Sequence, residues 1–475
     1  MRLPDGFVAV VKKDCPTCHL VIPALSQILD GPGLTVVTQD DPSWPPGFSP
    51  VDDTDLVVSW ELQTETTPTL YRVEGGTVTE SVAGWSRREW ESVTGLADLA
   101  PELPEHRPGC GSLIFEPLVH ERLQRAANGR RTRSRTVELG SAEDEHEAMA
   151  ARGWTDGLPV VPPTPERVER MLTGTTRDPG EVVCVLAPDL VPCTVEKVAI
   201  NAVMAGCLPE FLPVVLASVE AVATDRFNIH GVSATTFFVG PVIVVNGPIR
   251  ERIGMNSGMN ALGPGNRANS TIGRALNLVV RNVGGAKPGG VDRATLGSPA
   301  KIGLCFPEAE EGSPWESLST EQGFGPEAST VSLFAGHGPH EIVDQISRTP
   351  ESLARSFAEQ LRTVWHPKLA MRFDALVVVS PEHARTFAEA GWSKARLRAE
   401  IQDVLTRPGT ELIRDAGGIA EGLPPSFAEA IIPKFREDGL WFVRAGGTAG
   451  MFSGVIGGWS SGPGGSELTT VEIRP

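Results

Sequence analysis

Phe7-Val8-Ala9-Val10-Val11 is followed by Cys15-Pro16-Thr17-Cys18 and then by a second apolar run at residues 21–25. The first run predicts a buried strand and the second a helix. A cysteine at such a junction lies over free backbone N–H groups at the positive end of the helix, and both favour its thiolate. Cysteines at this spacing can also close a disulfide. The pattern therefore predicts dithiol–disulfide chemistry by Cys15 and Cys18.

The residues that follow continue an alternation of strands and helices. Thr67-Pro68 leads into a strand, and Gly75-Gly76 predicts a hairpin to the next one. Ser86 is placed to cap the last helix of this part. The predicted strands are 34–38, 69–73 and 77–83, and the predicted helical stretches are 56–66 and 86–96.

This order, with Cys-x-x-Cys early and Thr-Pro late, resembles the thioredoxin family over residues 1–97. The resemblance implies that Pro68 is a cis proline beside the cysteines, that Cys15 attacks and that Cys18 resolves the mixed disulfide. It also implies a redox-active Cys15–Cys18 disulfide, with no other cofactor assigned, and a disulfide reductase system as partner. The chain lacks the extra N-terminal strand and helix of full thioredoxins. Asp14 stands where the family usually has Trp, so substrate choice and redox poise are expected to differ.

A zinc site is the alternative for this motif, with Cys15, Cys18 and His19 as ligands. Zinc would need further ligands at similar spacing. No second Cys-x-x-Cys follows in the chain. Dithiol chemistry is therefore favoured, and thiol-based metal handling is left open.

Composition describes a globular protein of two or three domains. The chain has 475 residues, 40% of them apolar, and a formal net charge of −17. That charge argues against nucleic-acid or anionic-membrane partners, which need a basic face. No apolar run reaches the ~18 residues of a membrane span, and the N-terminus does not resemble a signal peptide. Seven cysteines are too few for a disulfide framework, so we expect a cytoplasmic protein with reduced thiols.

Residues 98–150 are predicted to be a Pro- and Gly-rich linker, 98–110, followed by a charge-split helical connector. A solvated connector that pairs opposite charges is the favoured interpretation, and a partner-docking surface is the alternative. The basic residues are Arg122, Arg125, Arg130, Arg131, Arg133 and Arg135, and the acidic ones are Glu138, Glu143, Asp144, Glu145 and Glu147.

The remainder, 151–475, is predicted to be a larger α/β domain with a mainly parallel sheet, because short apolar runs alternate with helical ones. A further division near residue 370 is left open, and no internal repeat is evident. The predicted helices are 195–206, 214–223, 271–283, 350–364 and 394–405, and the predicted strands are 241–245, 375–379 and 440–443.

This remainder is similar to bacterial proteins that carry a thioredoxin-like domain before a large domain. Those proteins share Gly-Trp-Thr-Asp-Gly-Leu-Pro near the start of the large domain, as at residues 153–159, and Gly-Gly-x-Ala-Gly-x-Phe-Ser near its end, as at 446–453. The resemblance implies no substrate.

Two glycine-rich stretches are candidate sites for a small anionic substrate. One opens a helix, where free N–H groups favour phosphate or carboxylate. The other follows the strand at 440–443 and is expected to lead into a helix, an arrangement that places ligands at the carboxyl end of a parallel sheet. A plain turn is the alternative for each. The candidate ligands are Asn266, Arg267, Asn269 and Ser270 in the first stretch, and Gly446, Gly447 and Thr448 in the second.

Three further residues are candidates for chemistry. Cys193 is expected at a helix N-terminus, where its thiolate is favoured. His230, in a polar and turn-like setting, is the best general base available. Cys110 lies between two glycines and is expected to be exposed and able to exchange with Cys15 and Cys18.

The sequence therefore predicts a thiol–disulfide oxidoreductase module that supplies reducing equivalents to a fused α/β enzyme domain. The oxidised sulfur would belong to Cys193, to Cys110 or to another protein. A lyase or hydrolase with a merely structural module is the alternative. A homo-oligomer is left open.

Overall fold

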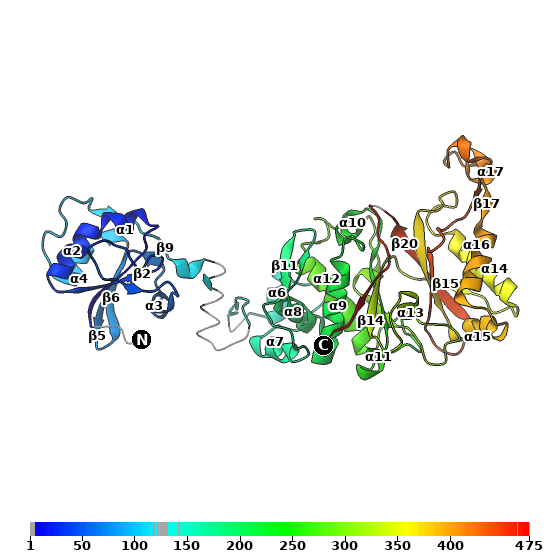
Figure 1. The fold of residues 1–475 in the computed structure, drawn as a ribbon, viewed down its shortest axis with the longest axis horizontal. Helices are drawn as coiled ribbons and strands as arrows, with labels where there is room; N and C mark the ends of the chain where they lie inside the picture. The colour runs from blue at the N-terminus through cyan, green and yellow to red at the C-terminus, as the bar shows by residue number, and fades with distance from the viewer. Residues whose placement is uncertain are drawn as a thin grey trace. The chain divides into compact units, whose positions relative to one another are not determined.

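The computed structural model describes residues 5–116, 119–120, 123, 132–140, 143–462 and 464–474. The chain forms two compact units, Met1–Arg135 and Thr136–Pro475 (Figure 1). The division lies inside the predicted connector, of which Arg122, Arg125, Arg130 and Arg131 lie outside the described residues. Within the part that is described, no helix is long and apolar enough to cross a membrane.

The first unit is built on a five-stranded mixed sheet in the order β3-β2-β1-β5-β6. β1 pairs in parallel with β2 and antiparallel with β5, so it lies at the centre. The strands are β1 (Gly6–Val11), β2 (Leu34–Thr38), β3 (Val51–Asp52), β5 (Thr69–Glu74) and β6 (Thr77–Ala83). The helices are α1 (Pro16–Leu20), α2 (Ile22–Asp30), α3 (Val57–Glu61) and α4 (Arg87–Thr94).

The unbroken apolar run of β1 is explained by burial on both faces. Ala9 and Val11 pack against α2 and α4, and Val8 and Val10 pack with Val58 of α3 on the other face. These cores hold the end of β1, and thus the segment that carries the cysteines, in a fixed place.

The prediction that residues 98–110 form a linker is wrong for the last of them, because these residues belong to the first unit. His106–Arg107 (β8) pairs with Trp85–Ser86 (β7), and Cys110–Gly111 (β9) pairs with Thr66–Thr67 (β4). We call residues 106–111 the strap. Two-residue strands carry no periodicity, so composition alone suggested a linker.

The second unit contains an eight-stranded sheet in the order β13-β12-β14-β20-β16-β19, with β15 on β20 and β21 on β14. Its strands are β12 (Gly240–Asn246), β13 (Leu304–Pro307), β14 (Thr330–Gly336), β15 (His340–Val343), β16 (Phe373–Val379), β19 (Leu440–Arg444), β20 (Phe452–Ser460) and β21 (Thr469–Glu472). Its larger helices are α7 (Pro165–Leu172), α8 (Val195–Ala205), α9 (Leu212–Val222), α12 (Arg267–Asn282), α14 (Pro350–Arg362), α15 (Pro381–Glu389) and α16 (Lys394–Leu405).

Shorter elements complete this unit. The helices are α6 (Glu145–Ala151), α10 (Ile229–Ala234), α11 (Ile249–Arg252), α13 (Leu318–Glu321) and α17 (Gly409–Leu412). Two small antiparallel pairs are β10 (Val182–Leu186) with β11 (Val191–Thr194), and β17 (Arg407–Pro408) with β18 (Ile431–Ile432).

The large sheet is folded into two halves that face each other. Alternate residues of β12, such as Ile243 and Val245, join the core under α8, α9 and α12. Those of β16, such as Val377, join the core under α14, α15 and α16. The intervening residues, among them Val244 and Val378, meet in a shared inner core. The layers therefore run helix, sheet, sheet, helix, and the two helix groups flank the strands in Figure 1.

The prediction of a mainly parallel sheet is wrong. Only the β12–β13 and β16–β19 pairs of the large sheet are parallel among the described strands, and the other pairs are antiparallel. The error has a cause in the sequence: β20 contains Gly454, Gly457 and Gly458 and reads as loop. The residues after the 446–450 glycine stretch therefore form this strand and not the expected helix.

The two halves repeat one topology that the sequence does not reveal. A helix, a central strand, further helices, a parallel strand and an antiparallel strand occur as α9-β12-α12-β13-β14 and again as α14-β16-α16-β19-β20. The halves then exchange their last strands, because β15 follows β14 but pairs with β20, and β21 follows β20 but pairs with β14. The predicted boundary near 370 falls where the second central strand begins.

Glycines form the corner where the halves join. β14 and β20 pair at Gly336 and Gly458. A Cβ at Gly458 would come within 2.7 Å of Asp374 O and 2.8 Å of Phe334 Cζ. The opposite edges also meet, since Ala309 N, just beyond β13, donates to Arg444 O of β19 at 2.7 Å.

Gly458→Ala is expected to destabilise the second unit by about 1–3 kcal/mol, because the added methyl group meets backbone and a buried ring. Gly454→Ala, in the same strand, is the matched control, because its Cβ would make only ordinary contacts at 3.6 and 3.9 Å. Calorimetric unfolding of the full chain measures both. Equal transitions for the two variants would contradict this account of the corner.

Candidate functional site

The cysteine pair lies where the chain passes from β1 into α1. Cys15 is the N-cap of α1 in an extended conformation, and Pro16 occupies the first helical turn. Cys18 follows one turn later, and its Sγ accepts a hydrogen bond from Lys12 N at 3.5 Å. Both cysteines are fully buried.

The Thr67–Pro68 segment borders this pair. Cys15 Sγ lies 3.4 Å from Thr67 O, to which it donates as a thiol. The Thr67–Pro68 peptide bond is cis, as the resemblance implied. Segments distant in sequence therefore converge on Cys15.

The strap covers the pair. Thr17 Oγ1 donates to Pro108 O at 2.8 Å, and Lys12 Nζ donates to Gly111 O at 2.8 Å. Gly109 must be glycine, because a Cβ would overlap the Thr66 side chain and approach Thr67 O to 2.6 Å. The cover accounts for the complete burial of a cysteine at a chain junction.

Cys110 belongs to the strap and adds a third thiol to the site. It is half-buried and registers opposite Thr67. Its thiol is close enough to Cys15 for each to shift the pKa of the other. The sequence predicted that Cys110 is exposed and able to exchange with Cys15 and Cys18; the residue lies beside Cys15, but it is partly buried.

The three thiols differ in their pKa values: that of Cys15 is lowered, and those of Cys18 and Cys110 are raised. The hydrogen bond from Cys18 lowers the pKa of Cys15 to about 5 against the effect of burial, helped by Cys110 and by the N–H groups of Thr17 and Cys18. Burial, with the hydrogen bond to Cys15, raises the pKa of Cys18. The same two causes raise the pKa of Cys110. These shifts favour the thiolate at Cys15 and the protonated thiol at Cys18 and Cys110.

An open hollow of about 570 Å³ lies beside the pair. Asp40 receives hydrogen bonds from the N–H groups of Lys13 and Asp14, at 2.8 and 2.9 Å. Lys13 also pairs with Asp41 at 2.7 Å. The surface next to the cysteine pair is therefore charged at this hollow. The hollow is lined by Lys13, Asp14, His19, Asp40, Asp41 and Pro42.

In the second unit, the structure brings the two glycine-rich stretches together. Gly446 N donates to Ser257 O at 2.9 Å, and Gly447 packs against Met259. Ser270 and Thr448 are exposed.

The amide and guanidinium groups predicted to bind an anion make hydrogen bonds that hold the loop. Asn266 caps α12 by accepting from Asn269 N at 3.0 Å. Asn269 is buried and donates to Asn256 O at 2.8 Å. Arg267 donates to Gly206 O at 2.9 Å. These bonds give each group a role in the fold.

Cys193 and His230 are not brought into one site. Cys193 is buried in β11 and precedes Thr194, which caps α8. Its pKa is raised, first by its hydrogen bond to Cys184 and then by burial, so the predicted thiolate at Cys193 is wrong. His230 is exposed on α10.

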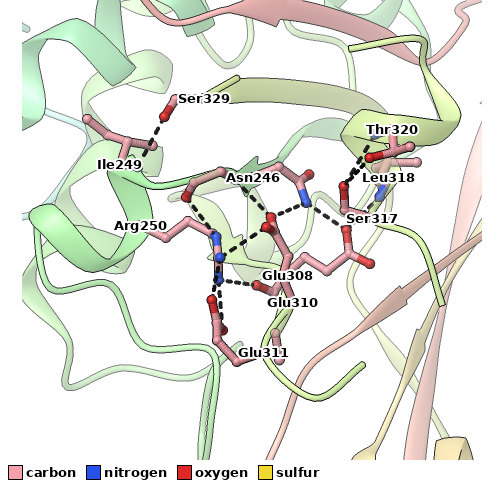
Figure 2. A network of polar contacts seen from close by, with 12 residues as sticks. Asn246, Ile249, Arg250, Glu308, Glu310, Glu311, Ser317, Leu318, Thr320 and Ser329 are labelled. Atoms are coloured by element: carbon pink, nitrogen blue, oxygen red, sulfur yellow. Dashed lines mark hydrogen bonds and ion pairs between the residues drawn. The ribbon is translucent and has the colours of Figure 1, made fainter. Parts of the chain in front are cut away.

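A buried polar network that the sequence did not predict lies at the end of β12, as Figure 2 shows. Asn246, fully buried at the end of β12, donates to Glu308 at 2.7 Å and to Glu310 at 2.8 Å. Arg250 donates to Glu308 O at 2.8 Å and pairs with Glu311 at 2.7 Å. Polar residues directly after apolar strands were the signal that could have revealed it.

This network also links the two halves of the sheet. Glu308 follows β13, and Lys394, at the start of α16, lies 3.8 Å from it and 2.8 Å from Glu321. Burial raises the pKa of Glu308 although Lys394 opposes the shift. Asn246 Oδ1 is buried without a partner among the described atoms.

Comparison with protein-family models, with curated proteins and with solved structures finds no match for this chain. Within the described residues, no group of three or more His, Cys, Asp or Glu side chains is placed to hold a metal ion. The functional argument therefore depends on the geometry of this chain.

Cys110→Ala is expected to raise the pKa of Cys15 from about 5 toward the ordinary value of about 8.5, because one donor to the thiolate is lost. The pH dependence of Cys15 alkylation, followed by peptide mass spectrometry, measures the shift. Cys305→Ala, which removes a buried thiol in the other unit, is the control. An unchanged profile would show that Cys110 does not act on Cys15.

Lys394→Met is expected to destabilise the second unit by about 3–5 kcal/mol, because it leaves buried carboxylates uncompensated. Lys301→Met provides the comparison, since the Lys301–Asp292 pair is less buried and should cost less. Denaturant unfolding of the full chain measures both. A smaller loss for Lys394→Met than for Lys301→Met would contradict the role assigned to the network.

Proposed function

We propose that the first unit is a thioredoxin-like thiol–disulfide oxidoreductase. The observation that carries the proposal is that the two cysteines have opposite pKa shifts. Cys15 has a pKa of about 5, and the pKa of Cys18, one turn away, is raised. A low-pKa thiol beside a protonated partner is the arrangement that disulfide exchange requires. The position of Thr67–Pro68 beside Cys15 supports the same assignment.

The reaction follows from these positions. The Cys15 thiolate attacks one sulfur of a substrate disulfide, a Cys15–substrate bond forms, and the other substrate sulfur leaves as a thiolate that takes up a proton. Cys18 then loses its proton and attacks Cys15 Sγ, and the first substrate sulfur leaves. The substrate gains two electrons and two protons, and the unit keeps the Cys15–Cys18 disulfide. A disulfide reductase or a dithiol must restore it.

The strap adds a step before attack. Because Cys15 is fully buried, a substrate sulfur reaches it only after residues 106–111 move away. Cys110 moves with them, so its effect on the pKa of Cys15 is lost in the open form.

For the whole chain, we propose that this module supplies reducing equivalents to the α/β unit, in a cytoplasmic setting where thiols stay reduced. The fusion raises the effective concentration of one unit for the other. The meeting point of the two glycine-rich stretches is the proposed place for a small anionic substrate.

Cys18→Ser is expected to trap a mixed disulfide on Cys15, because the resolving thiol is gone. Digestion without reductant and mass spectrometry identify the captured sulfur. Cys15→Ser is the matched control and should trap nothing at residue 15 and lose disulfide reductase activity to the background rate of an insulin reduction assay. A full chain that reduces insulin equally well with Cys15→Ser would overturn the proposal.

A further inference from the structure

A second pair of cysteines lies in the second unit, on the hairpin formed by β10 and β11. The strands are antiparallel, and Cys184 registers directly opposite Cys193. Residues opposite each other in such a pair have Cα atoms about 4.5–5.5 Å apart. Disulfides span about 4.4–6.8 Å between Cα atoms, so the backbone already meets the requirement for a bond.

The two thiols are unequal. The presence of Cys193 lowers the pKa of Cys184, whereas Cys184 and burial together raise the pKa of Cys193. Cys193 is buried in the core under α8, whereas Cys184 is only partly buried. The two pairs are therefore alike, because in each pair the pKa of one cysteine is lowered and that of its partner is raised.

Cys184 is also the sulfur that a reagent can reach. Cys184 is partly exposed, whereas Cys193, opposite it, is fully buried. Cys207 and Cys305 differ in this respect, because both are buried and burial raises their pKa values.

We propose that Cys184 and Cys193 form a reversible disulfide, a second redox site of this chain. With a low-molecular-weight disulfide as oxidant, the Cys184 thiolate attacks one of its sulfurs and the first thiolate leaves. Cys193 then loses its proton and attacks Cys184 Sγ, and the second thiol leaves. One Cys184–Cys193 bond forms, and two electrons and two protons pass to the oxidant.

The proposed function supplies the reverse reaction, and this part rests on it. Cys15 attacks Cys184, the accessible sulfur, and Cys193 leaves and takes up a proton. Cys18 then attacks Cys15 and releases Cys184 as a thiol. The dithiol of one unit is thereby exchanged for the disulfide of the other, within a chain or between two copies.

Oxidised glutathione added to the full chain tests the pair. The expected product is a Cys184–Cys193 crosslinked peptide, with Cys207 and Cys305 still reduced. In Cys193→Ala, Cys184 is expected to carry glutathione instead, because no second thiol displaces it. Two free thiols at 184 and 193, under conditions that oxidise Cys15 and Cys18, would overturn the proposal, as would stable glutathione on wild-type Cys184.

Limiting dithiothreitol added to the oxidised chain tests the reductant. We expect the Cys184–Cys193 bond to open at least about tenfold faster in the wild type than in Cys15→Ser, because the fused dithiol acts at high effective concentration. Equal rates, with the Cys18→Ser trap still working, would remove the first unit as donor and leave the second redox site standing. Failure of the trap would instead count against the proposed function alone.

Discussion

The second unit depends on one packing constraint: the inner faces of two half-sheets must cover each other. Val244 and Val378, on the two central strands, contribute to that shared core. Helices already cover the outer faces, so the inner residues would be exposed to water if the halves separated. The glycine corner at Gly336 and Gly458 lets the sheet turn, and the Lys394–Glu308 contact joins the halves through a buried charge pair.

Much of the first unit could be predicted from sequence, because its signals are local. Alternation of apolar strands, a Gly-Gly hairpin and the Cys-x-x-Cys junction each mark a structure within a few residues. The strap could not be predicted, since its strands are two residues long and their partners are distant. Cys110 reaches Cys15 only through that long-range pairing, and its effect on the pKa of Cys15 is therefore invisible in the sequence.

In the second unit the five predicted helices and the strands β12, β16 and β19 are confirmed, but α15 was missed and the association of the strands was not predicted. β20 is rich in glycine because it turns a corner, and the same residues hide its strand character. The polar residues predicted as anion ligands have a structural explanation as well. Their stretch is dense in polar groups because Asn266 caps a helix and Asn269 holds a loop in place. These structural roles explain such a composition as well as an anion site would.

The strap lies between α4 and residues 112–115, and both of these neighbours pack on the first unit. The cover of the two cysteines is therefore held at both ends by the unit that it covers. A fragment ending at residue 97 would keep the Cys-x-x-Cys motif but lose both the cover and the third thiol. Its cysteine pair would be more exposed and its Cys15 thiol less acidic than in the full chain, so the residues beyond the resemblance are part of what sets the properties of this pair.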